Sequence, residues 1–157
     1  MDIDKIFQDY DQKKEEQKIA RDQEWDIQTK ATDAGLKIIE SSVVPVLEDI
    51  AEQIVAKGYK AEIKKGLEGS VHPRIELKFY PVPPDSVPHS HISPSKIEFR
   101  CQEKDRLKVT REINTQSGRV SSYISGPREL TAAHEDASQD WVRKTTLEFI
   151  QAVLSSN

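Results

Sequence analysis

Cysteine, glycine and long apolar segments are scarce in this chain of 157 residues, and each shortage excludes a class of protein. The single cysteine, Cys101, can form no disulfide within the chain, and it excludes a zinc site built from cysteines. No apolar run approaches the ~18 residues that a membrane helix needs, so we expect no segment that spans a bilayer.

The motifs of catalysis and nucleotide binding are also missing. The segment from Gly66 to Ser70 is too short for a phosphate-binding loop and lacks the Gly-Lys-Ser/Thr ending. The chain has no Gly-x-Ser-x-Gly elbow, and no serine or cysteine is tied by its spacing to a histidine and an acid. Cys101 is in phase with apolar neighbours and is expected to be buried. The sequence therefore predicts no catalytic residue, no cofactor and a protein that is not an enzyme.

Charge is what the chain has in abundance. Charged residues make up 32% of it and apolar residues 36%, with a net charge of −4. This composition fits one domain of ordinary size with a large solvated surface. The first residues, Met1 to Lys5, are acidic and contain no apolar segment, so we expect no secretory signal and predict a cytoplasmic location.

Residues 1–35 are predicted to form a polar helix that extends as an arm. Neither proline nor glycine occurs between residues 4 and 34, and residues that favour helices dominate. A 3-4 spacing drawn along this helix includes three polar positions: Lys13, Gln17 and Glu24. These positions disfavour a stable coiled coil. One interpretation is a helix anchored at one end with its middle in solvent, and a disordered N-terminus is another.

The alternative interpretation of this segment is a helix that binds a partner. Its anchors are four apolar or aromatic residues spaced to share one face: Ile3, Ile6, Phe7 and Tyr10. The expected partner is a protein that the sequence does not identify, and a homodimer through this helix is one form of the hypothesis.

Two further helices are predicted after the arm. The segment 36–57 carries one apolar helical stripe and is expected to be buried. Pro45 lies inside it, so either Ser42 caps a new helix there or one long helix is kinked. A second amphipathic helix is expected near the C-terminus, after a capping box of Asp136 and Gln139.

Between these helices the period of the apolar residues changes from 3.6 to 2, which predicts strands. Five short alternating segments begin near Tyr59, Arg74, Lys96, Leu107 and Val120, and the last extends to Ile124. Their gaps have hairpin length, which favours an antiparallel meander. Arg111 is in phase with the apolar side of its strand, so we expect a bulge or a strand end there. Pro127 is expected to end the sheet.

The outward positions of the predicted strands are charged. Three strands each present a basic-Glu-basic triplet: Lys60-Glu62-Lys64, Arg74-Glu76-Lys78 and Lys96-Glu98-Arg100. Laid side by side, such triplets can form cross-strand ion pairs. A face this charged cannot be covered by a helix, so both helices must pack on the opposite face.

The predicted fold is therefore α+β. An antiparallel sheet of about five strands carries two helices on one face and is preceded by an extended N-terminal helix. In terms of domains, the chain consists of the arm at 1–35 and a single two-layer α+β domain at 36–157, with a proline-rich loop at 81–94.

The proline-rich loop at 81–94 contains the residues closest to a metal-site pattern. His89 and His91, together with Asp85, could chelate a transition ion if the loop were held. The spacing places no third good ligand beside them, so solvated histidines are the simpler interpretation. Metal or small-ligand binding through residues 85–91 is the functional alternative here.

Nucleic-acid binding by the sheet is a further alternative. The basic side chains available for it are Lys60, Lys64, Arg74, Lys78, Lys96 and Arg100. A glutamate interrupts each basic pair, and Tyr80 is the only outward aromatic residue of the predicted sheet, whereas a sheet that stacks bases needs several exposed rings. These features disfavour nucleic acid as a partner.

No named family is matched by these residues. In architecture alone, a small acidic α+β domain resembles the secretion chaperones that dimerise and bind unfolded effector segments, although those chaperones interleave strands and helices differently. The function is not readable from the sequence. The leading hypothesis is a non-enzymatic cytoplasmic protein-interaction module of an assembly or chaperone-like kind.

Overall fold

The computed structural model describes residues 2–67, 72–81, 93–103, 106–114 and 129–156. The α-helices are α1 (Ile3–Ile38), α2 (Val44–Ala56) and α3 (Gln139–Ser156); the π-helix η1 (Ile39–Val43) joins α1 to α2, and the 3-10 turn η3 (His134–Asp136) precedes α3. The strands are β1 (Lys60–Gly66), β2 (Arg74–Tyr80), β3 (Ser95–Glu103), β4 (Arg106–Glu112) and β5 (Glu129–Ala133).

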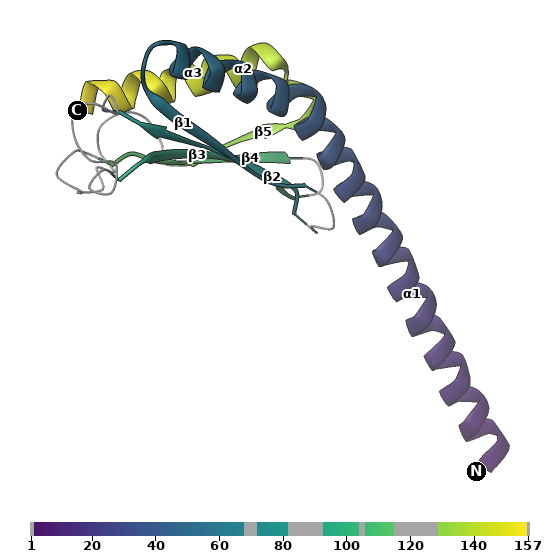
Figure 1. Ribbon diagram of the computed structural model, residues 1–157. Helices are drawn as coiled ribbons and strands as arrows, with labels where there is room; N and C mark the ends of the chain where they lie inside the picture. The colour runs from purple at the N-terminus through teal and green to yellow at the C-terminus, as the bar shows by residue number, and fades with distance from the viewer. Residues whose placement is uncertain (1, 68–71, 82–92, 104–105, 115–128, 157) are drawn as a thin grey trace.

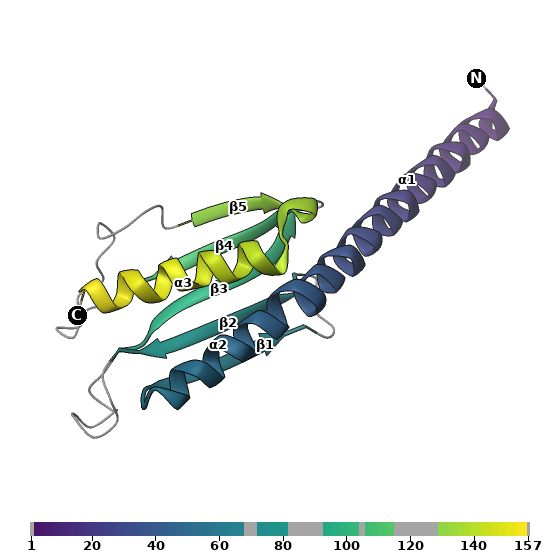
Figure 2. The same ribbon diagram turned by 90° about the horizontal axis from the view of Figure 1, so that it is seen from above.

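The five strands form one antiparallel meander in the order β1-β2-β3-β4-β5. Helix α2 packs on β1 and β2, and α3 packs on β3, so the two helices lie side by side across one face of the sheet (Figures 1 and 2). No helix of the described chain covers the other face (Figure 1). The predicted α+β fold, with five strands and two helices on one face, is confirmed.

Alternation along the strands places the core. In β2 and β4 every second side chain is buried, beginning with Ile75 and Leu107. These side chains form one cluster with those of α2, η1 and α3, and its largest fully buried members are Phe99, Phe149, Ile39, Leu47, Ile75, Leu77, Ile97 and Leu107. Because burying one such side chain contributes about 1.5–3 kcal/mol, this layer between helices and sheet is what holds the domain together.

The chain runs from α1 into α2 as one continuous helix whose geometry changes in η1. Pro45 has no N–H, so the carbonyl oxygen of Ser41 lacks the helical hydrogen bond from that position. The wider π turn spans this point, with the Val44 N–H donating to the carbonyl of Ile39. From α3, Gln139 Nε2 donates to the Ser41 carbonyl at 2.8 Å. Pro45 thereby leaves the Ser41 carbonyl available for this bond, which links α3 to the long helix.

Of the two alternatives at Pro45, the structure has one long helix, so Ser42 does not cap a new helix. Two local predictions are corrected. The sheet does not end at Pro127, since β5 follows at Glu129 as the fifth strand. The residue that caps α3 is Ser138 rather than Asp136, because the Ser138 hydroxyl accepts from the Trp141 N–H at 3.2 Å. The segment from Val120 to Ile124, predicted as the fifth strand, lies outside the described residues.

Arg111 lies within β4, directly opposite Ile97 and one residue before the strand ends. It is 8% exposed and sits on the helix side of the sheet. The register of the β3–β4 pair shifts between Cys101 and Glu103, not at Arg111. Of the two alternatives expected at Arg111, a bulge or a strand end, the structure therefore has the strand end, since β4 ends at Glu112. The long apolar stem of an arginine can occupy an inward position there.

Candidate functional site

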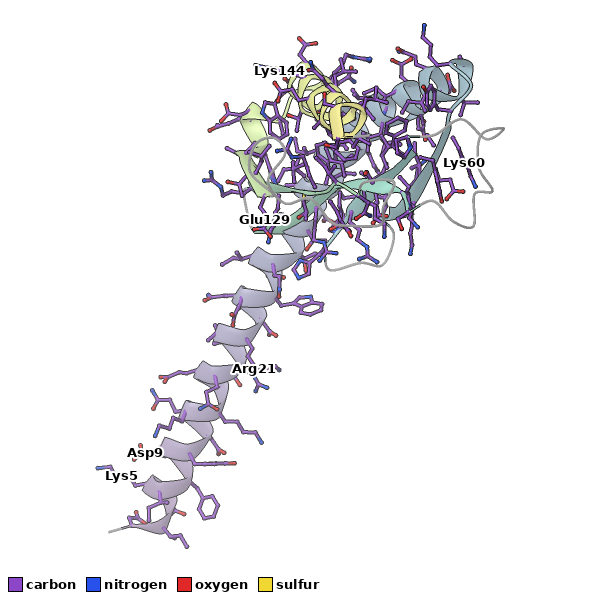
Figure 3. All side chains as sticks on the ribbon, turned by 90° about the vertical axis from the view of Figure 1, so that its left-hand side faces the viewer. Lys5, Asp9, Arg21, Lys60, Glu129 and Lys144 are labelled. Atoms are coloured by element: carbon purple, nitrogen blue, oxygen red, sulfur yellow. The ribbon has the colours of Figure 1, made fainter. Side chains whose placement is uncertain are left out.

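The N-terminal part of α1 lies apart from the rest of the chain. Every residue from 2 to 30 is exposed, and the first buried residue of α1 is Gly35. At about 1.5 Å per residue, this uncovered helix extends roughly 40 Å. Figures 1 and 3 show it leaving the sheet, with Lys5, Asp9 and Arg21 standing clear of the other elements. We call residues 2–30 the arm, and the described residues from Gly35 onward the body.

The four anchors predicted from the sequence lie at the free end of the arm. Their exposed fractions are 65% for Ile3, 49% for Ile6, 62% for Phe7 and 60% for Tyr10. At about 100° per residue, Phe7 and Tyr10 lie within about 40° of Ile3 around the helix, and Ile6 lies about 60° from it. The four therefore share one side, and we call them the tip patch.

The remaining large apolar residues of the arm form no such patch. Three of them are exposed and point to different sides of the helix: Ile19, Trp25 and Ile27. Only the tip patch gathers apolar surface on one side over consecutive turns.

Among the described residues, few contacts stabilise the arm as an isolated helix. The Asp2 carboxylate accepts from the Asp4 N–H at 3.2 Å and caps the first turn. Gln12 and Glu16 form a side-chain hydrogen bond at 3.4 Å. An isolated helix is marginal in water even with good residues, since most helical stability in proteins comes from packing of one face. The arm is therefore a segment that gains stability when another surface covers it.

The arm joins the body where Gly35 packs against β3. A Cβ at Gly35 would lie 2.7 Å from the Cβ of Cys101, so a glycine is needed for this approach. The Cys101 thiol donates to the Gly35 carbonyl at 3.4 Å, and its Sγ lies 3.9 Å from Nε2 of His134. We call Gly35, Cys101 and His134 the root cluster.

In the root cluster the thiol of Cys101 lies near the imidazole of His134, but the thiol is not activated. Burial raises the pKa of Cys101 from 9.0 to about 11, because desolvation disfavours the thiolate. A nucleophilic cysteine needs the opposite shift together with access to solvent, and Cys101 is 5% exposed. The cluster therefore packs the end of α1 onto the sheet, and Cys101 is the buried small side chain that its strand phase predicted.

We call the face of the sheet opposite the helices the open face. Its charged side chains lie beside one another on neighbouring strands. Between β2 and β3 each residue of one triplet faces the residue of like charge in the other: Arg74–Arg100, Glu76–Glu98 and Lys78–Lys96. The cross-strand ion pairs predicted from the triplets are therefore wrong for this pair of strands. The sequence pattern alone could not show this, because the register that aligns the triplets is set by the pairing of the whole strands.

The ion pairs of this face run along strands and across β4–β5. Arg100 Nε lies 3.0 Å from Glu98 Oε1, two residues along the same strand. Lys60 and Glu62 form a second such pair at 3.1 Å. Across β4 and β5, Lys108 lies 3.5 Å from Glu129. All of these pairs retain contact with solvent, the Arg100–Glu98 pair least, so each contributes about 1 kcal/mol or less.

All six basic residues considered for nucleic-acid binding lie on this open face. Those of β2 and β3 alternate with buried residues, and Lys60 and Lys64 lie opposite the outward Tyr80 and Glu76. Two of them, Lys60 and Arg100, pair with glutamates. The Tyr80 ring has the Lys60 ammonium 4.8 Å from its centroid, so its face is already in contact with a cation. No aromatic platform for bases is present on the described part of this face, and the arrangement lends nucleic-acid binding no support.

The predicted metal ligands His89, His91 and Asp85 lie outside the described residues. Within the ranges that the structure describes, no three His, Cys, Asp or Glu side chains gather closely enough to hold a metal ion. Across the same ranges, no helix combines the length and apolarity needed to cross a membrane.

Comparison with known proteins identifies no relative of this chain. No protein-family model matches the chain, and neither a curated protein nor a solved structure matches it. The function is therefore inferred from the arm, the root cluster and the open face themselves.

Two contacts that position the arm were not predicted from the sequence. Gly35 does carry a signal in the sequence: it is the first glycine of the chain and lies inside a helical segment, where glycine commonly marks a close approach. The bond from Gln139 to Ser41 carried no local signal, because it joins residues 98 positions apart.

Proposed function

We propose that this chain is a non-enzymatic protein-interaction module, in which the body holds out a helical arm and the tip patch binds a protein partner. The observation that supports this proposal is the uncovered arm, whose apolar side chains Ile3, Ile6, Phe7 and Tyr10 gather on one side at its free end. Anchors at helical spacing on an exposed helix are the pattern by which helices bind grooves and other helices.

The energetics favour binding through this patch. Fully burying an isoleucine or phenylalanine contributes about 1.5–3 kcal/mol, and Ile3 and Phe7 expose most of their surface. A tyrosine such as Tyr10 adds a large rigid ring with few rotatable bonds, which is why tyrosine is frequent among the residues that dominate interfaces. A partner that covers the patch also stabilises the helix that carries it.

An assembly or chaperone-like role in the cytoplasm is the form of this function that we propose. The arm separates the tip patch from the body by roughly 40 Å, so a partner can be held without contacting the sheet. The chain has a single cysteine and so needs no disulfide to fold, which is compatible with the reducing cytoplasm. Cell fractionation that recovered the chain outside the cytoplasm would contradict this part of the proposal.

The test replaces the tip patch in the full-length chain. A variant with Ile3, Ile6, Phe7 and Tyr10 changed to alanine keeps good helix formers while it removes the apolar surface. Tagged wild-type and variant chains are used to capture partners from cells of the source organism, and captured proteins are identified by mass spectrometry. We expect the variant to lose the partners that the wild type captures, by at least about tenfold in recovered amount.

The matched control changes the scattered residues Ile19, Trp25 and Ile27 to alanine and is expected to capture like the wild type. Circular dichroism of all chains checks that the arm remains helical. If the tip-patch variant captured the same proteins in the same amounts as the wild type, the proposed function would be refuted.

A further inference from the structure

One line of side chains across the open face carries positive charge alone. The strand register sets Arg74 opposite Arg100, and Arg100 opposite Lys108. At its two ends this line reaches residues without charge, Gly66 on β1 and Thr131 on β5. We call Arg74, Arg100 and Lys108 the basic row, because no acidic residue shares their line across the sheet.

The two neighbouring lines of the open face differ from the basic row. Two residues along the strands, the next line is mainly acidic, with Glu76 opposite Glu98. Two residues further, Lys78 lies opposite Lys96, and this lysine pair is flanked on the adjacent strands by Glu62 and Glu112. The lysine pair is therefore balanced by acids within its own line, whereas the basic row is not.

The arginines of the basic row have hydrogen-bond donors to spare. Arg74 forms no ion pair or hydrogen bond with any residue that the structure describes. Arg100 Nε lies 3.0 Å from Glu98 Oε1, but the two atoms are not aligned for a hydrogen bond. A guanidinium carries five N–H donors in a planar fork that matches a carboxylate. The basic row therefore offers directed donors as well as charge.

The cations of the basic row are spread along it rather than gathered at one point. A Cβ added at Gly66 would lie 3.2 Å from Cγ and Nε of Arg74, so this side chain lies against β1. Neighbouring strands are about 4.8 Å apart, so the row extends at least about 10 Å from β2 to β4. An elongated ligand with several carboxylates fits this spread better than a single small anion.

The acidic line beside the basic row restricts the kind of polyanion that can bind. It lies about 6.8 Å from the basic row, and it would repel nucleic acid, which is negatively charged at every unit. Residues three and four apart on a helix have Cβ atoms about 5–6 Å apart, close to the spacing of the strands. This charged face excludes an apolar helix, but a helix with carboxylates along one side and cations along the next complements both lines.

We propose that the basic row binds an acidic helix of a protein partner, which lies across β2, β3 and β4 with its carboxylates on Arg74, Arg100 and Lys108 (Figure 2). This surface belongs to the body and lies about 40 Å along the arm from the tip patch, so it goes beyond the proposed function. Its contacts are ion pairs at a solvated surface, so the binding is weak and sensitive to salt.

Nuclear magnetic resonance of the isotope-labelled full chain measures this binding. The probe is an alanine-based helical peptide with glutamates at spacings of three and four along one side and lysines along the next. In about 20 mM salt we expect the peptide to shift the amide signals of the basic row, with a dissociation constant of about 1 mM or tighter. About 200 mM salt should weaken it at least about fivefold. No shift at about 5 mM peptide would overturn the proposal.

Two matched variants remove equal charge from the same two strands. Arg74→Gln/Arg100→Gln removes two cations of the basic row and should weaken peptide binding at least about tenfold. Lys78→Gln/Lys96→Gln removes the balanced lysine pair and should stay within about threefold of the wild type. Circular dichroism checks that both variants fold. Equal losses in the two variants would mean that net charge alone attracts the peptide, and would overturn the assignment to the basic row.

Two further probes test the chemistry of the ligand. A peptide of the same composition, with glutamates and lysines interleaved around the helix, should bind at least about threefold more weakly, because its charges no longer match the two lines. A single-stranded oligonucleotide of about 10 nucleotides should bind no more tightly than the first peptide. If the oligonucleotide bound more tightly and the arginine variant lost it, nucleic acid would replace the acidic helix as the ligand.

The four-alanine variant of the tip patch separates this surface from the arm. It should bind the peptide within about threefold of the wild type, because it leaves the basic row unchanged. A larger loss would place the peptide on the arm and overturn the proposal. Since the peptide titration does not involve captured proteins, the proposed function and this inference can fail independently.

Discussion

Phe7 and Phe149 illustrate how differently this chain uses the same side chain in its two parts. Phe149 of α3 is fully buried between helices and sheet, whereas Phe7 of the arm is 62% exposed. In the body, the hydrophobic layer between the sheet and two helices supplies the stability. In the arm, a helix of similar backbone geometry has no described surface packed on it. Apolar side chains therefore hold the body together, whereas those of the arm are exposed.

The two parts also use charge differently. On the body, charged residues make the outer face of the sheet unsuitable for another layer, and the register aligns like charges across β2 and β3. On the arm, charges flank the tip patch at Asp4, Asp9 and Lys13 without covering it. Charged side chains thus disfavour packing on the outer face of the sheet, whereas on the arm they leave the side with the tip patch uncovered.

The largest expected effect on stability concerns the two phenylalanines compared above. Phe149→Ala should lower the free energy of unfolding by about 3–5 kcal/mol, because it leaves a cavity in the core. Phe7→Ala should change it by less than about 0.5 kcal/mol in dilute solution, where the side chain is exposed. Urea denaturation of both variants, followed by fluorescence and circular dichroism, measures the contrast. Equal losses in the two variants would mean that the arm packs on the body.

The next effect is a pH dependence at the root cluster. Because burial raises the pKa of Cys101 to about 11, the folded thiol keeps its proton at pH values where the unfolded thiol, with its ordinary pKa of 9.0, has lost it. Stability from this group is present below about pH 9 and lost as the pH rises towards 11, at about 1.4 kcal/mol per unit. Urea denaturation at pH 8 and 10.5 should show a larger loss for the wild type than for Cys101→Ala.

A cysteine introduced on the exposed arm provides the matched control for the reactivity of the buried Cys101. The exposed Gln23→Cys should react with a thiol reagent at pH 8 at an ordinary rate, whereas Cys101 of the folded wild type should react far more slowly. A rapid reaction of Cys101 under native conditions would contradict the packing at the root of the arm.

A smaller effect is expected where the arm meets the body. Gly35→Ala should destabilise the chain by about 1–3 kcal/mol, since the added Cβ would lie 2.7 Å from that of Cys101. In an open helix the same change stabilises by about 0.5–1 kcal/mol, so the sign identifies the close approach. Thermal unfolding measures it, and the neighbouring exposed Ala34→Gly, expected to cost only its helix propensity, is the control. A stabilising Gly35→Ala would show that α1 does not press on β3.

The smallest effect concerns the tie between α3 and the long helix. Gln139→Ala should cost about 1 kcal/mol, because the Ser41 carbonyl loses its donor. In the Pro45→Ala background, residue 45 regains an N–H for that carbonyl, so the same change should cost less. A double-mutant cycle by urea denaturation measures the coupling. Additive losses would show that Gln139 does not compensate for Pro45.

The strands and helices were predictable where one periodicity held over a whole element. Residues 74–80 alternate without exception, and their inward side chains are buried as predicted. The prediction failed at two elements whose local signal was ambiguous or weak. Ser138 rather than Asp136 caps α3, and β5 has too few large apolar residues to mark it as a strand.

The tip patch could be named from spacing alone, because Ile3, Ile6, Phe7 and Tyr10 share a helical side whatever the rest of the chain does. That no described element covers it could not be derived from sequence, since the same four residues would look identical if they packed on the sheet. The root cluster was equally hidden, because Gly35 and Cys101 meet across 66 positions of sequence.

By itself, the amino-acid sequence determined the local structure of this protein: a long polar helix, an amphipathic helix interrupted by Pro45, alternating strands and one charged face. These follow from propensities and periods that act over a few residues. Only the tertiary structure decided the register that aligns like charges, the contact of Gly35 with Cys101, and the departure of the arm from the sheet. Each of these depends on which surfaces meet, and that is set by the packing of segments far apart in the chain.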